Sequence, residues 1–211
     1  MNLQVLPTGA FSANCYVIWN EPDKAVVIDP GADPDKITSI LNKSKLTPCV
    51  YLLTHGHYDH IAATGEMLKA CPAPVKLHEN DAAWAFSRVN SFPPYYKPLE
   101  KPEQLESNIK DGGILESGTL KIKIIETPGH SPGSVCFYVD GCGMLFSGDT
   151  LFAASVGRTD LPGGDWDTLM SSLNKLMNIG DDVKVYAGHG GATTIAKERR
   201  TNPYIVNMAN K

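Results

Sequence analysis

One six-residue stretch constrains this chain more than any other. It runs from His55 to His60 in the order His-Gly-His-Tyr-Asp-His, and it holds three of the six histidines of the sequence. Such crowding of imidazoles around a carboxylate has no structural benefit, whereas together these groups form a ligand set for metal ions. Ligands at positions 55, 57 and 59 cannot all face one way on a regular strand and also meet His60. We therefore predict a loop that folds around one or more metal ions.

Further candidate ligands follow other predicted strands. Strand-like patterns end near residues 127, 146 and 186, and His130, Asp149 and His189 come shortly after them, each directly preceded by a glycine. Ligand sites of α/β proteins gather at the carboxyl ends of strands, and glycine lets the backbone turn sharply or approach a bound group there. The candidate set is His55, His57, Asp59, His60, His130, Asp149 and His189. Seven ligands exceed the four of a lone zinc ion, so we predict two divalent metals that share a carboxylate, with zinc, iron or manganese suiting these donors.

The apolar patterns along the chain alternate between strand and helix periods. Strands are predicted at 14–19, 25–29, 50–53, 75–77, 120–126, 134–139, 144–146 and 183–186, and helices at 34–41, 61–70, 80–86, 166–177 and 192–200. Asp33 and Asn80 are the predicted N-caps of the first and third helices. Residues 88–107 contain four prolines and are predicted to be a long irregular connection, either a lid or a rigid surface crossover. We find no linker, and we predict a single mixed α/β domain over residues 1–211.

Composition narrows the function classes. The formal net charge is −4 and there is no long basic run, which disfavours a nucleic-acid partner. Apolar stretches are too short to span a bilayer, and the N-terminus lacks the pattern of a signal peptide, so we expect a cytoplasmic protein without a membrane partner. The five cysteines form no C-x-x-C pair, and we expect free thiols in a reducing compartment. His78 is predicted to be a polar surface or capping residue and not a ligand.

The ligand pattern His-x-His-x-Asp-His at 55–60, followed in order by His130, Asp149 and His189, resembles the metallo-β-lactamase superfamily over nearly the whole chain. The early AVVIDPG segment also fits, because that superfamily places a structural aspartate, here Asp29, behind the metal loop. The resemblance implies a four-layer αβ/βα sandwich with the metals at one edge. It further implies one metal held by His55, His57 and His130, a second held by Asp59, His60 and His189, and a bridge formed by Asp149 and a hydroxide.

A finer resemblance concerns residues 155–165 (SVGRTDLPGGD), residues 197–203 (KERRTNP) and the length of the chain. These features are similar to the short bacterial glyoxalase II-type hydrolases, which hydrolyse the thioester S-lactoylglutathione. The resemblance implies a small-molecule, glutathione-linked thioester as the partner and a metal-bridging hydroxide as the nucleophile, which Asp59 would orient. Two features depart from full-length glyoxalase II. Gly56 stands where those enzymes usually have another histidine, and their C-terminal helical domain has no counterpart in this sequence.

Six residues are candidate contacts for the carboxylates of an anionic thiol. They are Arg158, Tyr95, Tyr96, Lys97, Arg199 and Arg200. We expect Arg158 to tie loops together near the site more than to touch substrate, and a solvated helix face explains the other two arginines equally well.

Three other functions of the same superfamily compete with hydrolysis. A persulfide dioxygenase would use a single iron on His55, His130 and Asp149, and it also carries a Gly-Arg-Thr-Asp stretch. A nuclease is disfavoured because its RNA-processing members usually carry a large inserted domain, for which 211 residues leave no room. A diiron electron-transfer or sensor protein is disfavoured because those members have glutamate where this chain has His57. The oligomeric state stays open.

Overall fold

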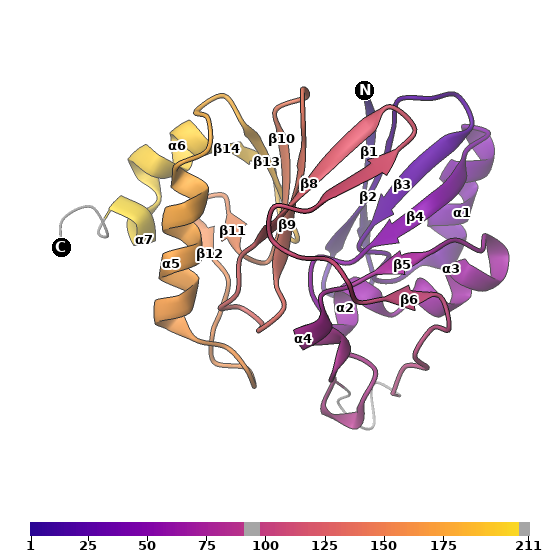
Figure 1. Ribbon diagram of the computed structural model, residues 1–211, viewed down its shortest axis with the longest axis horizontal. Coiled ribbons are helices and arrows are strands. Elements are labelled where there is room, and N and C mark those ends of the chain that lie inside the picture. The colour runs from indigo at the N-terminus through magenta and orange to yellow at the C-terminus, as the bar shows by residue number, and fades with distance from the viewer. Residues whose placement is uncertain (91–97, 207–211) are drawn as a thin grey trace.

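The computed structural model describes residues 1–90 and 98–206 and shows two sheets packed face to face, with helices covering the outer face of each (Figure 1). The first sheet contains, in spatial order, β1 (Asn2–Thr8), β2 (Ala13–Trp19), β3 (Lys24–Ile28), β4 (Thr47–Leu52), β5 (Val75–Lys76) and β6 (Leu105–Glu106). The second contains β14 (Thr193–Thr194), β13 (Lys184–Ala187), β10 (Met144–Gly148), β9 (Val135–Val139), β8 (Leu120–Glu126) and β7 (Ile114–Ser117). A short hairpin of β11 (Leu151–Phe152) and β12 (Ser155–Val156) follows β10.

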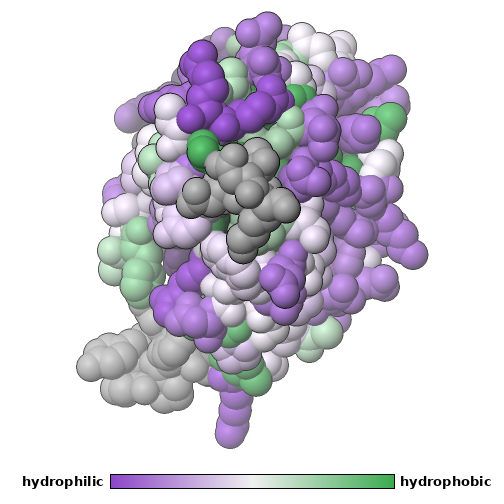
Figure 2. All heavy atoms as spheres, turned by 90° about the vertical axis from the view of Figure 1, so that its left-hand side faces the viewer, coloured by the Kyte–Doolittle hydropathy of each residue, from purple (hydrophilic) through white to green (hydrophobic). Residues whose placement is uncertain are grey.

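Helices α1 (Pro34–Lys43) and α3 (Thr64–Ala70) cover the outer face of the first sheet, and α5 (Trp166–Met177), α6 (Ile195–Thr201) and α7 (Pro203–Val206) cover that of the second (Figure 1). The short helices α2 (Tyr58–Ile61) and α4 (Glu79–Ala82) lie at the lower edge of the molecule in that view. The outer surface on the side of α5–α7 is mostly hydrophilic, with small separate hydrophobic areas (Figure 2). No helix within the described residues is long and apolar enough to cross a bilayer.

Three apolar cores hold these layers together, and neighbouring strand residues point into different cores because side chains alternate along a strand. In β3, Val27 packs with α1 and α3, whereas Ile28 packs between the two sheets. In β10, Phe146 lies in the same middle core, whereas Leu145 packs against α5. The predicted four-layer αβ/βα sandwich is therefore confirmed.

Strand direction brings the candidate ligands to one place. In the first sheet β3 and β4 are parallel. In the second sheet β8 and β10 are both antiparallel to β9, and β10 is parallel to β13, so β8, β10 and β13 run the same way. The carboxyl ends of these three strands consequently lie at one edge of their sheet, as the sequence pattern predicted.

Several predicted elements need correction. The predicted helix at 61–70 is two helices, α2 and α3, separated at Ala62 and Ala63. Asn80 does not cap the next helix, because the His78 side chain accepts a hydrogen bond from the Asn80 N–H and that helix already ends at Ala82. Asp33 precedes α1 as predicted, but its carboxylate makes no cap and instead accepts hydrogen bonds from the backbone N–H of Gly9 and from a lysine ammonium.

The last predicted helix is α6, which begins only at Ile195 because residues 193–194 form β14. The predicted irregular connection at 88–107 contains a 3-10 turn at Arg88–Asn90 and ends in β6, and its residues 91–97 lie outside the described part of the chain. Strands β1 and β7 and the two-residue strands β6, β11, β12 and β14 were not predicted. All five cysteines are free thiols, as expected.

Candidate metal centre

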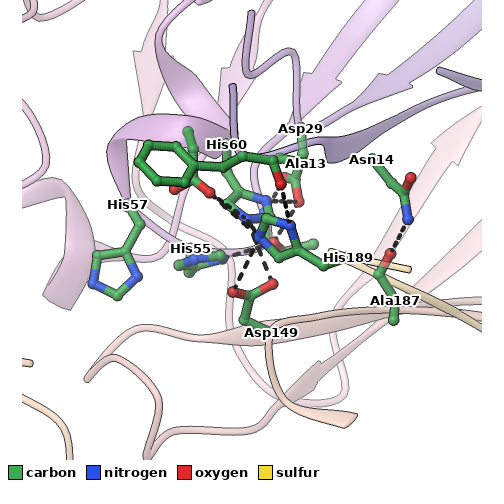
Figure 3. Close-up of polar contacts among 12 residues, drawn as sticks. Ala13, Asn14, Asp29, His55, His57, His60, Asp149, Ala187 and His189 are labelled. Carbon is green, nitrogen blue, oxygen red and sulfur yellow. Dashed lines mark hydrogen bonds and ion pairs between the residues drawn. The ribbon is translucent and has the colours of Figure 1, made fainter. Parts of the chain in front are cut away.

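The seven predicted ligands converge at the edge where the two sheets meet. The loop after β4 carries His55 and His57, and α2 carries Asp59 and His60, so the second half of the motif lies on a short helix and not on a loop as predicted. The segments after β8, β10 and β13 supply His130, Asp149 and His189. Figure 3 shows the rings of His60 and His189 and the carboxylate of Asp149 directed toward one another.

The ligand atoms form two groups. His55, His57 and His130 each offer one atom within 4.8 Å of the others, and we call them the first triad. Asp59, His60 and His189 do the same and form the second triad. Asp149 lies between the groups, with Oδ2 3.6 Å from Nε2 of His130 and Oδ1 3.4 Å from Nε2 of His60.

Hydrogen bonds on the far side of each ring fix which nitrogen faces the cluster. Nδ1 of His130 lies 2.8 Å from the carbonyl oxygen of Arg158, and Nδ1 of His189 lies 3.1 Å from that of Phe11. A carbonyl oxygen only accepts, so Nδ1 of both rings carries a hydrogen and Nε2 of each ring faces the other ligands.

Asp29 fixes two more rings. The residue is only 1% exposed. Its carboxylate accepts hydrogen bonds from the N–H of Thr54 at 2.7 Å and from the Thr54 hydroxyl at 2.6 Å. The same carboxylate lies 3.0 Å from Nδ1 of His60. Because the Thr54 hydroxyl donates to Asp29, it accepts from Nδ1 of His55 at 3.0 Å. His57 is the exception, since its Nδ1 faces the cluster, 2.9 Å from Nε2 of His130.

Residues of the first sheet also hold the loop of the second sheet that carries His189. The Asn14 side chain of β2 donates hydrogen bonds to the carbonyl oxygens of Ala187 at 3.0 Å, as Figure 3 shows, and of Gly190 at 2.9 Å. Between these carbonyls, a Cβ atom on Gly188 would lie 2.0 Å from Oδ1 of Asp149. Glycine before this ligand is therefore required for the close approach that the sequence pattern suggested.

The cluster fits metal ions on its own chemistry. Nε2 of His55 and Oδ1 of Asp149 are buried and have no hydrogen-bond partner among the described residues, which costs about 1–3 kcal/mol per group if nothing else binds them. Nδ1 of His57 and Nε2 of His130 face each other at 2.9 Å, so they either share one hydrogen or hold a cation between them. Ligands that bind one zinc ion at about 2.1 Å lie about 3.4 Å apart, and the contacts of His60 and His189 with Asp149 span 3.4 to 3.6 Å.

Burial and neighbouring charges prepare the two triads differently. Burial lowers the pKa of His55 well below its usual range, and burial together with the charge of His130 lowers the pKa of His57 to about 3. Both rings are therefore neutral near pH 7, which is the form that binds a metal. Burial also disfavours a charged His60, but Asp149 and Asp29 outweigh this effect and raise its pKa to about 10. The carboxylates thus draw positive charge to the second triad.

A cleft of about 690 Å³ opens onto the ligands. Its lining is Phe11, His57, Tyr58, Asp59, Asn90, His130, Asp149, Phe152, Val156, Arg158, Leu161 and His189. Asn90 was not predicted as a site residue. Its side-chain amide donates to the carbonyl oxygens of Gly56 and Ala85, both at 2.7 Å, and its amide oxygen accepts from the N–H of Tyr58 at 3.1 Å. Asn90, which belongs to the predicted irregular connection, therefore supports the loop that carries His55 and His57.

The predicted substrate residues are placed as follows. Arg158 lines the cleft, but its guanidinium pairs with Asp160 and its side chain is 63% exposed, while its backbone carbonyl holds His130. Arg199 binds Asp181 and the carbonyl oxygen of Met177 near the end of α5, outside the cleft. Arg200 is exposed on α6. Tyr95, Tyr96 and Lys97 lie outside the described residues.

His78 is a capping residue as predicted, but it is buried and not on the surface. Its Nδ1 accepts from the N–H of Asn80, and its Nε2 lies 3.1 Å from Oε1 of Glu126 at the end of β8. His78 is followed by the polar residues Glu79 and Asn80, so the local sequence gives no sign that its side chain is buried.

Comparison with known proteins places the cluster in a family. A family model described as the metallo-beta-lactamase superfamily matches residues 8–189. A probable metallo-hydrolase of Bacillus subtilis is 35% identical over 207 residues, covering 97% of this chain and 98% of the relative. Hydroxyacylglutathione hydrolase GloC of Haemophilus influenzae is 34% identical over 220 residues, covering 97% and 98%.

Solved structures agree. The crystal structure of the B3 metallo-beta-lactamase BLEG-1 superposes with a TM-score of 0.87 at 37% identity, covering 97% of this chain and 99% of that one. That of TTHA1623 in a di-iron-bound form gives a TM-score of 0.86 at 34% identity, covering 95% and 99%. The chain therefore belongs to the metallo-beta-lactamase superfamily.

Proposed function

We propose that this superfamily hydrolase cleaves thioesters, with S-lactoylglutathione or a related acyl-glutathione as its substrate, and that it uses two divalent metal ions, zinc in the first instance and iron or manganese otherwise. The observation that carries the proposal is the completeness of the two triads on either side of Asp149. A relative named as a hydroxyacylglutathione hydrolase, similar over nearly its whole length, supports the substrate class.

The chain's own residues account for most of the chemistry. Bound dications lower the pKa of water toward neutrality and polarise a carbonyl group. Asp59 lies in the cleft with Oδ2 3.3 Å from Nε2 of His189. Burial raises the pKa of Asp59, but the hydrogen bond and charge of His189 outweigh burial and lower it, so the carboxylate is ionised and can orient a nucleophilic water. The leaving group is a thiol with a pKa near 8.5, so it departs as a thiolate without a dedicated general acid.

A mononuclear persulfide dioxygenase is the second candidate, with iron on His55, His130 and Asp149. The di-iron form of one similar structure shows that a protein of this fold holds iron. The second triad favours the two-metal hydrolase, since Asp59, His60 and His189 offer a further complete ligand group for which a single iron has no use.

The decisive experiment is a thioester panel assayed on protein of measured metal content. We expect about two ions per chain, and hydrolysis of lactoylglutathione well above that of simple thioesters. The Asp149→Asn variant should lose metal and turnover together, because that carboxylate lies between the triads. Oxygen consumption with glutathione persulfide, without thioester hydrolysis, would establish the dioxygenase instead. Unchanged turnover in Asp149→Asn would refute the bridging role.

A further inference from the structure

A second buried aspartate, besides Asp29, lies beside the metal cluster. Asp81 on α4 has no exposed surface, and its carboxylate accepts three hydrogen bonds. The donors are the N–H of Gly56 at 2.7 Å, the hydroxyl of Ser131 at 2.6 Å and the N–H of Gly133 at 2.6 Å. Gly56 separates two ligands of the first triad, and Ser131 directly follows the third. One carboxylate therefore joins the two loops that carry this triad.

The backbone is shaped for this contact. A Cβ atom on Gly133 would lie 2.7 Å from the backbone N of Asp81, closer than real Cβ atoms approach. A Cβ atom on Gly56 would lie 2.9 Å from Cβ of Ala85, 3.2 Å from the Trp84 ring and 3.3 Å from Cβ of Asp81. Glycine at both positions allows the two loops to lie directly against α4.

The segment around Asp81 is itself anchored. His78 caps α4 and contacts Glu126, the last residue of the strand that leads to His130. Trp84, which follows α4, packs its ring against that of His57, with centroids 5.3 Å apart. The carboxylate is thus held in place by groups that do not bind metal, so it can determine where the loops lie.

The two buried aspartates serve different ligands. Asp29 contacts His60 directly and His55 through Thr54, so it touches both triads. The hydrogen bonds of Asp81 reach only the loops of the first triad. We propose that Asp81 is a positioning residue that sets the relative placement of His55, His57 and His130, and thereby the affinity of the first triad for its metal but not that of the second. This inference rests on the proposed two-metal site and not on the thioester substrate.

Replacing Asp81 with asparagine keeps the shape but converts one acceptor oxygen into an NH₂ donor. That group then faces either the N–H of Gly56 or the N–H of Gly133, so one of the two loops loses a hydrogen bond and meets a second donor in its place. Losing a group that orients metal ligands typically weakens metal binding by about 10–100-fold. We expect a loss of that size at the first triad and a change of less than about threefold at the second.

Glu198 provides a matched control. It too is a carboxylate with no exposed surface and three donors, namely the N–H of Ala154, the hydroxyl of Thr193 and the amide of Asn202. None of these residues is a predicted ligand. The Glu198→Gln variant should therefore lower the urea midpoint of the metal-free protein as Asp81→Asn does, while leaving the affinity for both metals as in the wild type.

The test is a zinc titration of the metal-free protein against a chromophoric chelator, with cobalt absorption spectra as a second readout of ligand geometry. Asp81→Asn is measured alone and in two backgrounds that leave one triad each. In His189→Ala, Asp81→Asn should weaken the remaining ion by about 10–100-fold, whereas in His57→Ala it should leave the remaining ion nearly unchanged. Ser131→Ala, which removes one of the three donors, should show a smaller loss in the same direction and serves if Asp81→Asn does not fold.

Equal weakening in both backgrounds, no weakening in either, or the same metal loss in Glu198→Gln would overturn the positioning role. These results are separate from the proposed function. A wild-type chain that binds a single ion overturns the two-metal site itself, and failure to hydrolyse thioesters leaves the titration unaffected.

Discussion

Adding one methyl group at position 56 should destabilise the protein and displace a metal ligand. The new Cβ atom would lie 2.9 Å from Cβ of Ala85 and 3.2 Å from Cζ2 of Trp84. Cβ of an alanine cannot rotate away, so the loop and α4 must separate. Overpacking a buried site of this kind costs about 1–3 kcal/mol, which lowers the folding equilibrium constant by a factor of about 5–150. Because Trp84 packs against His57, the same displacement should weaken zinc binding.

Gly65 offers the same substitution in an unobstructed place. It lies in α3, and a Cβ atom there meets nothing within 4 Å. Gly65→Ala should therefore stabilise the metal-free protein by about 0.5–1 kcal/mol, because alanine loses less backbone entropy than glycine when the helix forms. Urea unfolding of both metal-free variants beside the wild type measures the contrast. If Gly56→Ala unfolds at the same urea concentration as the wild type, α4 does not pack against the loop as described.

Three further predictions address the core, a surface charge and the cleft. Phe137→Ala should lower the free energy of unfolding in urea by about 3–5 kcal/mol, because the ring is fully buried between the sheets. Ile114→Ala, at an exposed position, should change it by less than about 0.5 kcal/mol. Equal losses in the two variants would contradict the packing of Phe137 in the middle core. The hydrogen bond from Lys36 and that from the Gly9 N–H lower the pKa of Asp33, so its contribution is present above the unfolded pKa of about 3.9 and is lost as pH falls through the folded value. Asp33→Asn should therefore cost less than about 1 kcal/mol of unfolding free energy at pH 7 and low salt, and progressively less as the pH falls below about 3.9. A cost that does not decline in acid would contradict this ionic origin. Arg158→Ala should keep full metal content in elemental analysis, because His130 binds the backbone carbonyl of that residue and not its side chain; loss of metal would show that the guanidinium supports the site.

The metal ligands could be predicted from the sequence because each follows an apolar strand pattern, and strand direction then brings them together. Their supporting residues could not. Asp81 meets Gly133, 52 positions away, and nothing in the local pattern KLHENDA marks its carboxylate as buried. Asn90 lies in a stretch without periodicity, so its contacts with the metal loop have no sequence signal. Burial of a polar side chain depends on which distant loops cover it, and periodicity reports only the burial of apolar ones.

The two longest of the missed strands, β1 and β7, have a different cause. β1 lies at an edge of its sheet, and only Thr8 of its residues is buried, so its sequence lacks the alternation that marks a half-buried strand. Pro7 within it also argues against a strand, although an edge position tolerates proline. β7 is an edge strand of the second sheet, and none of its residues is buried. Both strands form because a neighbour, β2 or β8, presents a full row of hydrogen-bonding groups.

Position 56 shows how a departure from a family pattern acquires a physical meaning. In the sequence, Gly56 stands out as a departure from full-length glyoxalase II, which usually has a histidine at this position. In the structure, the space that a side chain would need at 56 is filled by Ala85 and Trp84, which are not among the residues that line the cleft. A histidine there would displace α4 and with it Asp81, whose carboxylate holds both loops of the first triad. The residue at 56 therefore depends on how closely α4 approaches the metal loop, and a chain with histidine at this position must place that segment differently, whatever thioester it binds.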